Sequence, residues 1–338
     1  MNKMPRKISI KDALQLADAQ FFDTRSPKEF EHDHLPHAVN IPILDNDERA
    51  IVGTLYKQVS PDKAIAQGME YVAKNMPDIV KKINEHRGKK MVIYCWRGGM
   101  RSGVIVSFLE ALKYDVYQLE GGHKAFRKYV SERLDNYQLK PKVIILWGLT
   151  CTGKTDLLHK FPNSIDIEGL AQHNGSLYGA LGKKPNSQYR FDNLLLQRLD
   201  ELQEEKWILL EGESRRIGDL MIPGFLYKAM LSGTHILIKR SLDKRAELCA
   251  AVYINEKNKQ EAIAISASLN RVISKKKKEE MVSCMEKGDF VSASKILLEW
   301  YYDPLYANTL KKMEYAAEID NDDLEEGVRE LKECIASQ

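Results

Sequence analysis

Apolar positions along the first 135 residues alternate between short β-rich runs and longer stretches with helical spacing. Runs of four or five residues favour strands, and apolar residues at three- and four-residue intervals favour amphipathic helices. The strand candidates are Gln20–Asp23, Ala38–Ile41, Met91–Tyr94 and Val116–Leu119, and the clearest helix candidates are Lys63–Lys74 and Val104–Leu112. This alternation predicts an α/β domain with a parallel sheet.

A mostly polar stretch separates this pattern from a second one. Residues 136–142 contain Pro141, and a buried strand pattern at Val143–Trp147 follows them. We therefore expect one domain over residues 1–135 and another over residues 142–338.

The second domain is expected to be α/β at first and mostly helical beyond Leu242. Its further strand patterns lie at Trp207–Leu210 and His235–Ile238. Asp322, followed three residues later by Glu325, predicts a capping box at the start of the last helix. The fold class is therefore α/β in both domains, with a helical C-terminal extension.

The composition is that of an ordinary globular protein. The chain has 338 residues, of which 43% are hydrophobic and 29% charged, and its formal net charge is +3. This charge is compatible with a nucleic-acid partner but does not argue for one by itself. The first residues keep acquiring charges, and no long uncharged apolar run follows, so we expect neither a secretory signal nor a membrane span.

The cysteines are few and widely spaced. The five of them form no Cys-x-x-Cys pair and no Cys/His cluster, so neither a disulfide framework nor a structural zinc site is predicted. Such usage suits a reducing cytoplasm, which is the location we expect. The five are Cys95, Cys151, Cys249, Cys284 and Cys334.

The loop after the Met91–Tyr94 strand carries the clearest chemistry of the first domain. Cys95 ends the strand, and glycines and arginines follow before a helix begins. Inward-pointing amides, a helix N-terminus and guanidinium groups all favour a thiolate over a thiol and also bind oxyanions. A structural core cysteine is the alternative, but core cysteines prefer apolar neighbours. We therefore predict a catalytic Cys95 beside an anion site made of Arg97, Gly98, Gly99, Arg101 and Ser102.

The segments on either side of this loop resemble the rhodanese-like domain family. Phe22–Phe30 and Leu35–Pro42 are similar to its opening motif, and Leu119–Phe126 is similar to its closing strand, turn and helix. The resemblance implies that Cys95 carries sulfur or selenium. The histidines near the opening motif lack partners at metal spacing and are interpreted as turn or surface residues; they are His32, His34 and His37.

The thiol loop differs from the commonest rhodanese loop in one respect. Five residues separate Cys95 from Arg101, one more than usual and the same number as in cysteine phosphatases. A loop of this size predicts a phosphate-sized tetrahedral anion near Cys95. Such an anion fits a phosphatase and fits selenophosphate equally well.

A phosphate-binding loop opens the second domain. Gly148 to Thr155 follow the pattern G-x-x-x-x-G-K-T between a buried strand and a helix. In this pattern glycine backbone wraps phosphate oxygens, Lys154 neutralises their charge, and Thr155 can reach a magnesium ion or a phosphate oxygen. We therefore predict a diphosphate site at Gly148, Gly153, Lys154 and Thr155, with Cys151 as a filler position.

The acid expected opposite such a loop is atypical. The strand Trp207–Leu210 is followed by Glu211 where nucleotide-hydrolysing enzymes of this class usually have Asp. Nucleotide hydrolysis is therefore in doubt, and the ligand need not be ATP. We assign no metal.

Three polar segments are candidate substrate loops, because α/β folds bind ligands at the carboxyl ends of their strands. They are residues 167–176, 188–192 and 211–218, and ordinary surface loops are an equal alternative. They supply Glu168, Glu211 and Arg215 as candidate substrate or metal contacts. The aromatic segment Trp300–Tyr306 is interpreted as a core seam that ends at a proline turn.

The order of a Cys-Trp-Arg-Gly-Gly-x-Arg-Ser loop and a P-loop resembles the tRNA 2-selenouridine synthase family. Segments 168–171, 213–218 and 301–306 extend the resemblance over most of the chain. It implies a transferase that places a geranyl group from geranyl diphosphate on the sulfur of wobble 2-thiouridine in tRNA. Selenium from selenophosphate then replaces the sulfur, and Cys95 either carries selenium or accepts the displaced group.

The resemblance further implies tRNA as the partner, with a selenophosphate-supplying protein as a second candidate. It implies no tightly bound cofactor and leaves open a need for Mg²⁺. Three alternatives remain: an ATP-dependent tRNA sulfurtransferase, a fusion of a cysteine phosphatase with a kinase, and a non-catalytic rhodanese-fold binding module. The cationic surroundings of Cys95 argue against the last of these.

Overall fold

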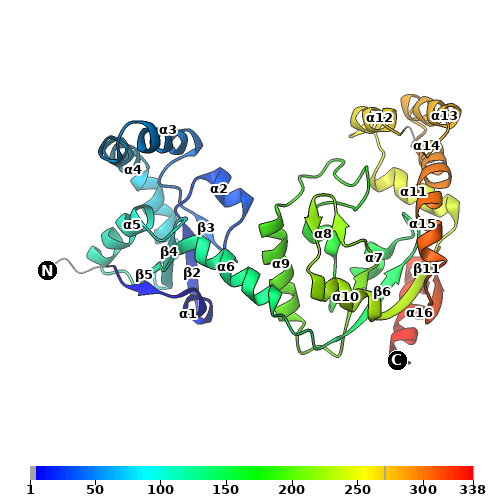
Figure 1. The fold of residues 1–338 in the computed structure, drawn as a ribbon, viewed down its shortest axis with the longest axis horizontal. Helices are drawn as coiled ribbons and strands as arrows, with labels where there is room; N and C mark the ends of the chain where they lie inside the picture. Colours follow the sequence, from blue (N-terminus) through cyan, green and yellow to red (C-terminus); the bar gives the residue numbers. More distant parts are fainter. Residues whose placement is uncertain (1–4, 270–271, 338) are drawn as a thin grey trace. The chain divides into compact units, whose positions relative to one another are not determined.

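The computed structural model describes residues 5–269 and 272–337 of the chain (Figure 1). These residues form two compact units, which divide between Asn136 and Tyr137. Both units are α/β, as predicted. Within the described ranges, no helix combines the length and the apolar character needed to cross a bilayer.

The first unit is built around a parallel five-stranded sheet with the order β1-β5-β4-β2-β3. Its strands are β1 (Lys7–Ile8), β2 (Ala19–Asp23), β3 (Val39–Asn40), β4 (Lys90–Tyr94) and β5 (Val116–Leu119). Its helices are α1 (Ile10–Gln15), α2 (Pro27–His32), α3 (Asn46–Gln58), α4 (Pro61–Asn84), α5 (Met100–Ala111) and α6 (Gly122–Asp135). The central strand β4 is buried from Met91 to Tyr94, so the residue that follows it is held at a fixed place.

The second unit contains a parallel five-stranded sheet with the order β12-β11-β6-β8-β7. Its strands are β6 (Lys142–Trp147), β7 (Ser164–Ile165), β8 (Trp207–Glu211), β11 (Thr234–Lys239) and β12 (Ala317–Asp320), and β9 (Arg216–Ile217) pairs with β10 (Leu220–Met221). The first strand of this unit, β6, is central, and later strands lie on both sides of it. The end of β6 is therefore the switch point at which such folds bind ligands.

Helices complete the second unit. Those between the strands are α7 (Lys154–Leu158), α8 (Ile167–Ala171), α9 (Gln188–Glu201) and α10 (Gly224–Ser232). Then follow α11 (Leu242–Val252), α12 (Lys259–Ala267), α13 (Lys275–Glu286), α14 (Phe290–Leu297), a π-helical turn (Leu298–Tyr302), α15 (Asp303–Leu310) and α16 (Leu324–Ala336). The helices from α11 to α15 form a largely helical subdomain with its own apolar core. This subdomain is the helical extension that the sequence predicted beyond Leu242.

Three local predictions were wrong. The last helix is capped by Asp323, whose side chain accepts from the Glu326 amide, so the capping position lies one residue beyond Asp322. Residues 188–192 form the first turn of α9 rather than a loop, because Ser187 caps the Arg190 amide. Pro304 makes no turn, since proline fits the first turn of α15 without losing a hydrogen bond.

Candidate functional site

Cys95 lies at the carboxyl end of β4, where the thiol loop turns into α5. Its Sγ accepts hydrogen bonds from the Gly99 amide and from the Ser102 hydroxyl, both at 3.3 Å. The residue is 3% exposed. The loop therefore presents donors to the sulfur, as predicted from the glycines and the helix start.

These donors favour the thiolate. Burial by itself raises the pKa of Cys95, but hydrogen bonds from Ser102 and the Arg97 amide, with the charge of Arg101, outweigh it and lower the pKa below its usual value. A lowered pKa makes more of the thiol available as a nucleophile at neutral pH.

The loop keeps its shape through glycines in the left-handed region. Gly98 has φ 63° and Gly122 has φ 55°. A Cβ on Gly122 would lie 2.2 Å from the Cys95 carbonyl oxygen, so the closing turn and the thiol loop are in direct backbone contact. The His123 amide donates to the same oxygen at 2.8 Å.

Gln118 on β5 also holds the loop. Its side-chain amide donates to the carbonyls of Gly98 and Gly99 and to the Ser102 hydroxyl, at 2.9–3.0 Å. This residue is 4% exposed and was missed by the sequence analysis, because its neighbours in space lie some twenty residues away in the chain. Its polar character within an otherwise apolar strand was the available signal.

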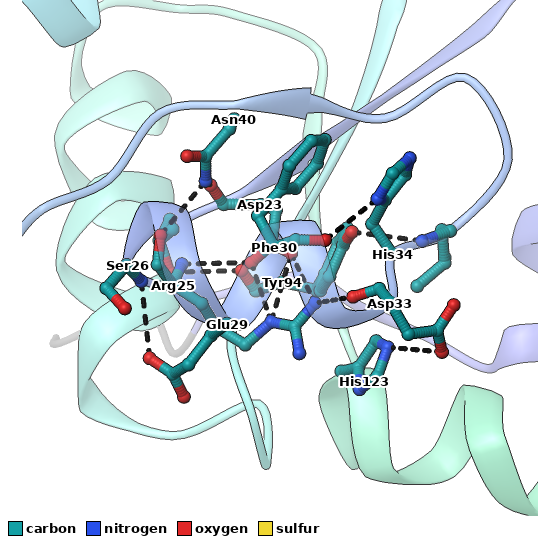
Figure 2. Close-up of polar contacts among 12 residues, drawn as sticks. Asp23, Arg25, Ser26, Glu29, Phe30, Asp33, His34, Asn40, Tyr94 and His123 are labelled. Atoms are coloured by element: carbon teal, nitrogen blue, oxygen red, sulfur yellow. Dashed lines mark hydrogen bonds and ion pairs between the residues drawn. The ribbon is translucent and has the colours of Figure 1, made fainter. Parts of the chain in front are cut away.

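The two arginines of the loop differ in their surroundings. Arg97 is exposed. Arg101 donates to Glu29 at 3.0 Å, and Glu29 accepts from the Ser26 amide in the capping box of α2. Figure 2 shows Glu29 and Ser26 at the start of this helix. The opening motif thus supplies the carboxylate that orients Arg101.

The opening motif itself is organised around a buried ion pair. Arg25, 2% exposed, donates from Nε and Nη2 to the Asp23 carboxylate and from Nη2 to the Asp33 carbonyl at 2.7 Å (Figure 2). The Asp33 carboxylate faces His123 at 3.0 Å. Burial lowers the pKa of His123 although Asp33 opposes the effect, so the ring is held as a neutral positioning group behind the thiol loop.

The three histidines that were interpreted as turn or surface residues lie at or near the surface of the first unit. His32 and His37 are exposed, and His34 stacks on Phe30 with its Nδ1 2.9 Å from the Phe30 carbonyl. Among the described residues, no group of three or more His, Cys, Asp or Glu side chains is arranged to hold a metal ion.

The P-loop connects β6 to α7 in the second unit. Gly153 has φ 81°, and a Cβ there would lie 2.5 Å from the Asn321 side-chain nitrogen, so both the backbone conformation and the close approach favour glycine. The Lys154 ammonium donates to the Gly148 and Leu149 carbonyls at 3.1 and 3.2 Å. Two distant side chains hold the loop backbone: Asn321 donates to the Thr152 carbonyl and Arg245 to the Thr150 carbonyl.

A carboxylate cluster adjoins the P-loop. Glu211, at the end of β8, accepts from the Thr155 hydroxyl at 3.3 Å and from the Glu168 amide at 3.1 Å. Burial, with the negative charges of Asp166 and Glu213, raises the pKa of Glu211 to about 8. Burial and neighbouring carboxylates also raise the pKa of Glu168, and burial raises that of Glu213. The raised pKa values mean that the buried negative charges lack a positive partner, so this site would favour the binding of a cation.

A cavity of about 600 Å³ contains the P-loop and this cluster in its walls. Lys154, Thr155, Glu168, Glu211 and Glu213 line it. The rest of the wall includes apolar and aromatic side chains from several helices, among them Leu231, Leu248, Leu297, Tyr302, Tyr306 and Leu310. The cavity thus combines an anion-binding region with an apolar one.

The structure brings most of the predicted residues of this site together, but not all. Arg215 is exposed on the loop after β8 and does not line the cavity. Glu213, two residues earlier, lines it instead. The predicted core seam has two roles in the structure. Tyr302 is buried in the apolar core of the helical subdomain, Tyr306 packs against that core, and both side chains also line the cavity.

Two family models match the chain. Residues 9–129 match the rhodanese-like domain, and residues 141–287 match the tRNA 2-selenouridine synthase AAA domain. The two units are thus a rhodanese-like domain and a P-loop domain joined in one polypeptide. The chain combines a rhodanese-like domain with the AAA domain of the tRNA 2-selenouridine synthase family, which confirms the predicted fusion. These matches indicate a tRNA-modifying enzyme of the selenouridine synthase type.

Solved structures resemble part of the chain, each over 37% of its length. One is the N-terminal domain of a putative ATP/GTP binding protein from Clostridium difficile 630, at 44% identity over 98% of that chain, with a TM-score of 0.36. Another is a rhodanese-related protein from Thermoplasma volcanium, at 22% identity over 92% of that chain, with a TM-score of 0.23. A third is the BH2092 protein from Bacillus halodurans, at 18% identity over 73% of that chain, with a TM-score of 0.22.

Proposed function

We propose that this protein converts wobble 2-thiouridine in tRNA to 2-selenouridine through an S-geranyl intermediate. Geranyl diphosphate binds at the P-loop and alkylates the uridine sulfur. Selenium from selenophosphate then replaces the geranylated sulfur in a step that uses Cys95. The protein acts in the cytoplasm, on tRNA, without a tightly bound cofactor.

The observation that carries this proposal is the mixed lining of the P-loop cavity. Lys154 and Thr155 lie in the same cavity as leucine and tyrosine side chains. A prenyl chain gains about 0.8 kcal/mol for each methylene that such a wall removes from water. The cavity volume of about 600 Å³ falls within the range of small-molecule sites. A diphosphate ester with an apolar tail fits both parts of this lining.

In the first step the uridine sulfur attacks the allylic carbon that carries the diphosphate. The carbon–oxygen bond breaks, the diphosphate leaves, and the base loses its N3 proton. Lys154 and the loop amides stabilise the negative charge of the leaving group. Thr155 and Glu211, which share a hydrogen bond, would hold a Mg²⁺ ion on that diphosphate, and the ion would neutralise further charge.

In the second step selenium displaces the geranylated sulfur. The Cys95 thiolate, with Arg97 and Arg101 as the cations nearest to it in the loop, is suited to a selenophosphate anion. Cys95 has two candidate roles, in carrying the selenium donor or in accepting the displaced group, and in both it acts without a change of oxidation state. The selenium of selenophosphate adds to C2 of the base, the carbon–sulfur bond breaks, and geranylthiolate leaves and takes up a proton. Water then cleaves the selenium–phosphorus bond and phosphate is released.

Mass spectrometry of tRNA nucleosides tests the proposal. Wild-type protein with geranyl diphosphate and selenophosphate should yield 2-selenouridine. Lys154→Ala should abolish geranylation, whereas Cys95→Ala should allow it and block selenium entry. Absence of both modified nucleosides with the wild-type protein would overturn the proposal, and loss of both steps in each variant would overturn the division between the two sites.

The same assay separates the alternatives. An ATP-dependent sulfurtransferase would turn over ATP during modification and would not need geranyl diphosphate. A phosphatase–kinase fusion would release phosphate from an aryl phosphate, and Cys95→Ala would lose that activity.

A further inference from the structure

Cys151 occupies an unusual backbone position inside the P-loop. Its φ is 63°, in the left-handed region that favours glycine. A residue with a Cβ adopts this conformation at a cost of roughly 1–2 kcal/mol. The side chain is 9% exposed, so the cost is not explained by a surface role. A thiol is therefore held at a place in the loop where glycine would be less strained.

A second thiol belongs to the same buried cluster. Cys249, on α11, is 1% exposed and packs in the apolar core that contains Cys151. Both residues also line the P-loop cavity. The two thiols thus lie in one cluster, next to a space that a small solute can enter.

The two thiols are not equivalent. The hydrogen bond that Cys151 donates lowers the pKa of Cys249 in spite of its burial, and the Arg245 charge acts in the same direction. The same hydrogen bond, together with burial, raises the pKa of Cys151. Cys249 is therefore the better nucleophile of the pair, and Cys151 is the thiol that remains protonated.

We propose that Cys151 and Cys249 form an oxidation site, at which hydrogen peroxide produces a reversible disulfide that switches off diphosphate binding by the P-loop. The inference rests on the phosphate-binding role of the loop and is independent of the geranyl chemistry.

The chemistry needs peroxide alone as the oxidant. The Cys249 thiolate attacks one peroxide oxygen, the O–O bond breaks, and the hydroxide that leaves takes up a proton to become water. Cys249 is then a sulfenic acid. The Cys151 sulfur attacks it, the S–S bond forms, and the sulfenic hydroxyl leaves as a second water with the Cys151 proton. Two thiols have been oxidised and one peroxide reduced, and a dithiol reverses the reaction.

The disulfide changes the loop because its geometry is narrow. A disulfide brings two sulfur atoms to about 2.05 Å, well inside the separation of hydrogen-bonded thiols. Cys151 lies in the P-loop and Cys249 on α11, so closing the bond displaces the loop relative to this helix. Its neighbours Thr150 and Thr152 are tied through their carbonyls to Arg245 and Asn321. The loop therefore distorts between two anchored residues, where its amides bind phosphate.

The test combines a disulfide map with a binding measurement on the full-length chain. We expect peroxide to produce a Cys151–Cys249 linked peptide and to weaken inorganic pyrophosphate binding by at least about tenfold, or 1.4 kcal/mol, in calorimetry. Dithiothreitol should restore it. Cys249→Ser, compared with its own untreated sample, should lose the peroxide effect, whereas Cys284→Ser, which changes a thiol on α13, should retain it.

Two results would overturn the proposal. One is the absence of the linked peptide under conditions in which Cys95 is oxidised. The other is a disulfide that leaves pyrophosphate binding unchanged. A reduced protein that failed to bind pyrophosphate would contradict the proposed function, whereas the peptide map decides on the oxidation site by itself.

Discussion

Replacing Ser102 with alanine tests the thiolate site through a single atom. Ser102 is fully buried, and its hydroxyl donates to the Cys95 sulfur at 3.3 Å. A hydrogen bond to a charged group contributes about 1.5–3 kcal/mol. Because about 1.4 kcal/mol corresponds to one decade in an equilibrium, the thiolate fraction at a fixed pH below the midpoint should fall roughly tenfold or more.

The assay is the rate of Cys95 alkylation by iodoacetamide, followed by peptide mass spectrometry across a pH series. In Ser102→Ala the rate profile should shift to higher pH while its plateau changes little. Ser107→Ala removes an exposed hydroxyl from the same helix and should leave the profile in place. An unshifted profile in Ser102→Ala would show that this hydroxyl does not stabilise the thiolate.

Gly122→Ala should lower the unfolding free energy of the first unit by about 2 kcal/mol or more, because its Cβ would meet the Cys95 carbonyl, whereas Gly88→Ala, with nothing within 4 Å, should cost less. Thermal unfolding compares the two, and equal losses would contradict the close approach. His123 has a lowered pKa, so the unfolded chain takes up its proton first, and stability should fall as the pH drops below about 6.5. His123→Asn should flatten that fall in urea titrations, and parallel curves would refute it. Glu211 has a pKa raised to about 8, so the folded state binds the extra proton, and stability should decline from about pH 4.5 to 8. Glu211→Gln should make this decline shallower, with Glu168 and Glu213 supplying the part that remains, and a decline as steep as that of the wild-type protein would contradict the burial of an uncompensated carboxyl.

Local patterns in the sequence were sufficient to predict the parts of the fold that depend on neighbouring residues. The prediction for Val116–Leu119 matches β5, and Val143–Trp147 lies within β6, because a buried parallel strand is a nearly continuous apolar run. The strand Ala317–Asp320 was not predicted. It carries acidic residues at two of its four positions and lies at the sheet edge, beyond five helices.

The residues of the candidate sites also fall into two groups, those that a local motif predicts and those that only the folded structure brings together. Contiguous motifs revealed Cys95 and the P-loop, because each is formed by one loop. The partners of these loops come from elsewhere: Gln118 on β5, Glu213 beyond β8 and Cys249 on α11. Their roles depend on how the sheet and the helices pack, which no local pattern encodes.

The central claim is that the P-loop cavity holds a prenyl diphosphate as its substrate. The most direct test is mass spectrometry of 2-thiouridine-containing tRNA incubated with the wild-type protein and geranyl diphosphate alone, with ATP alone as the parallel reaction. We predict S-geranyl-2-thiouridine in the first reaction and unmodified 2-thiouridine in the second. No S-geranyl product with geranyl diphosphate, or an ATP-dependent change of the nucleoside, would contradict the account.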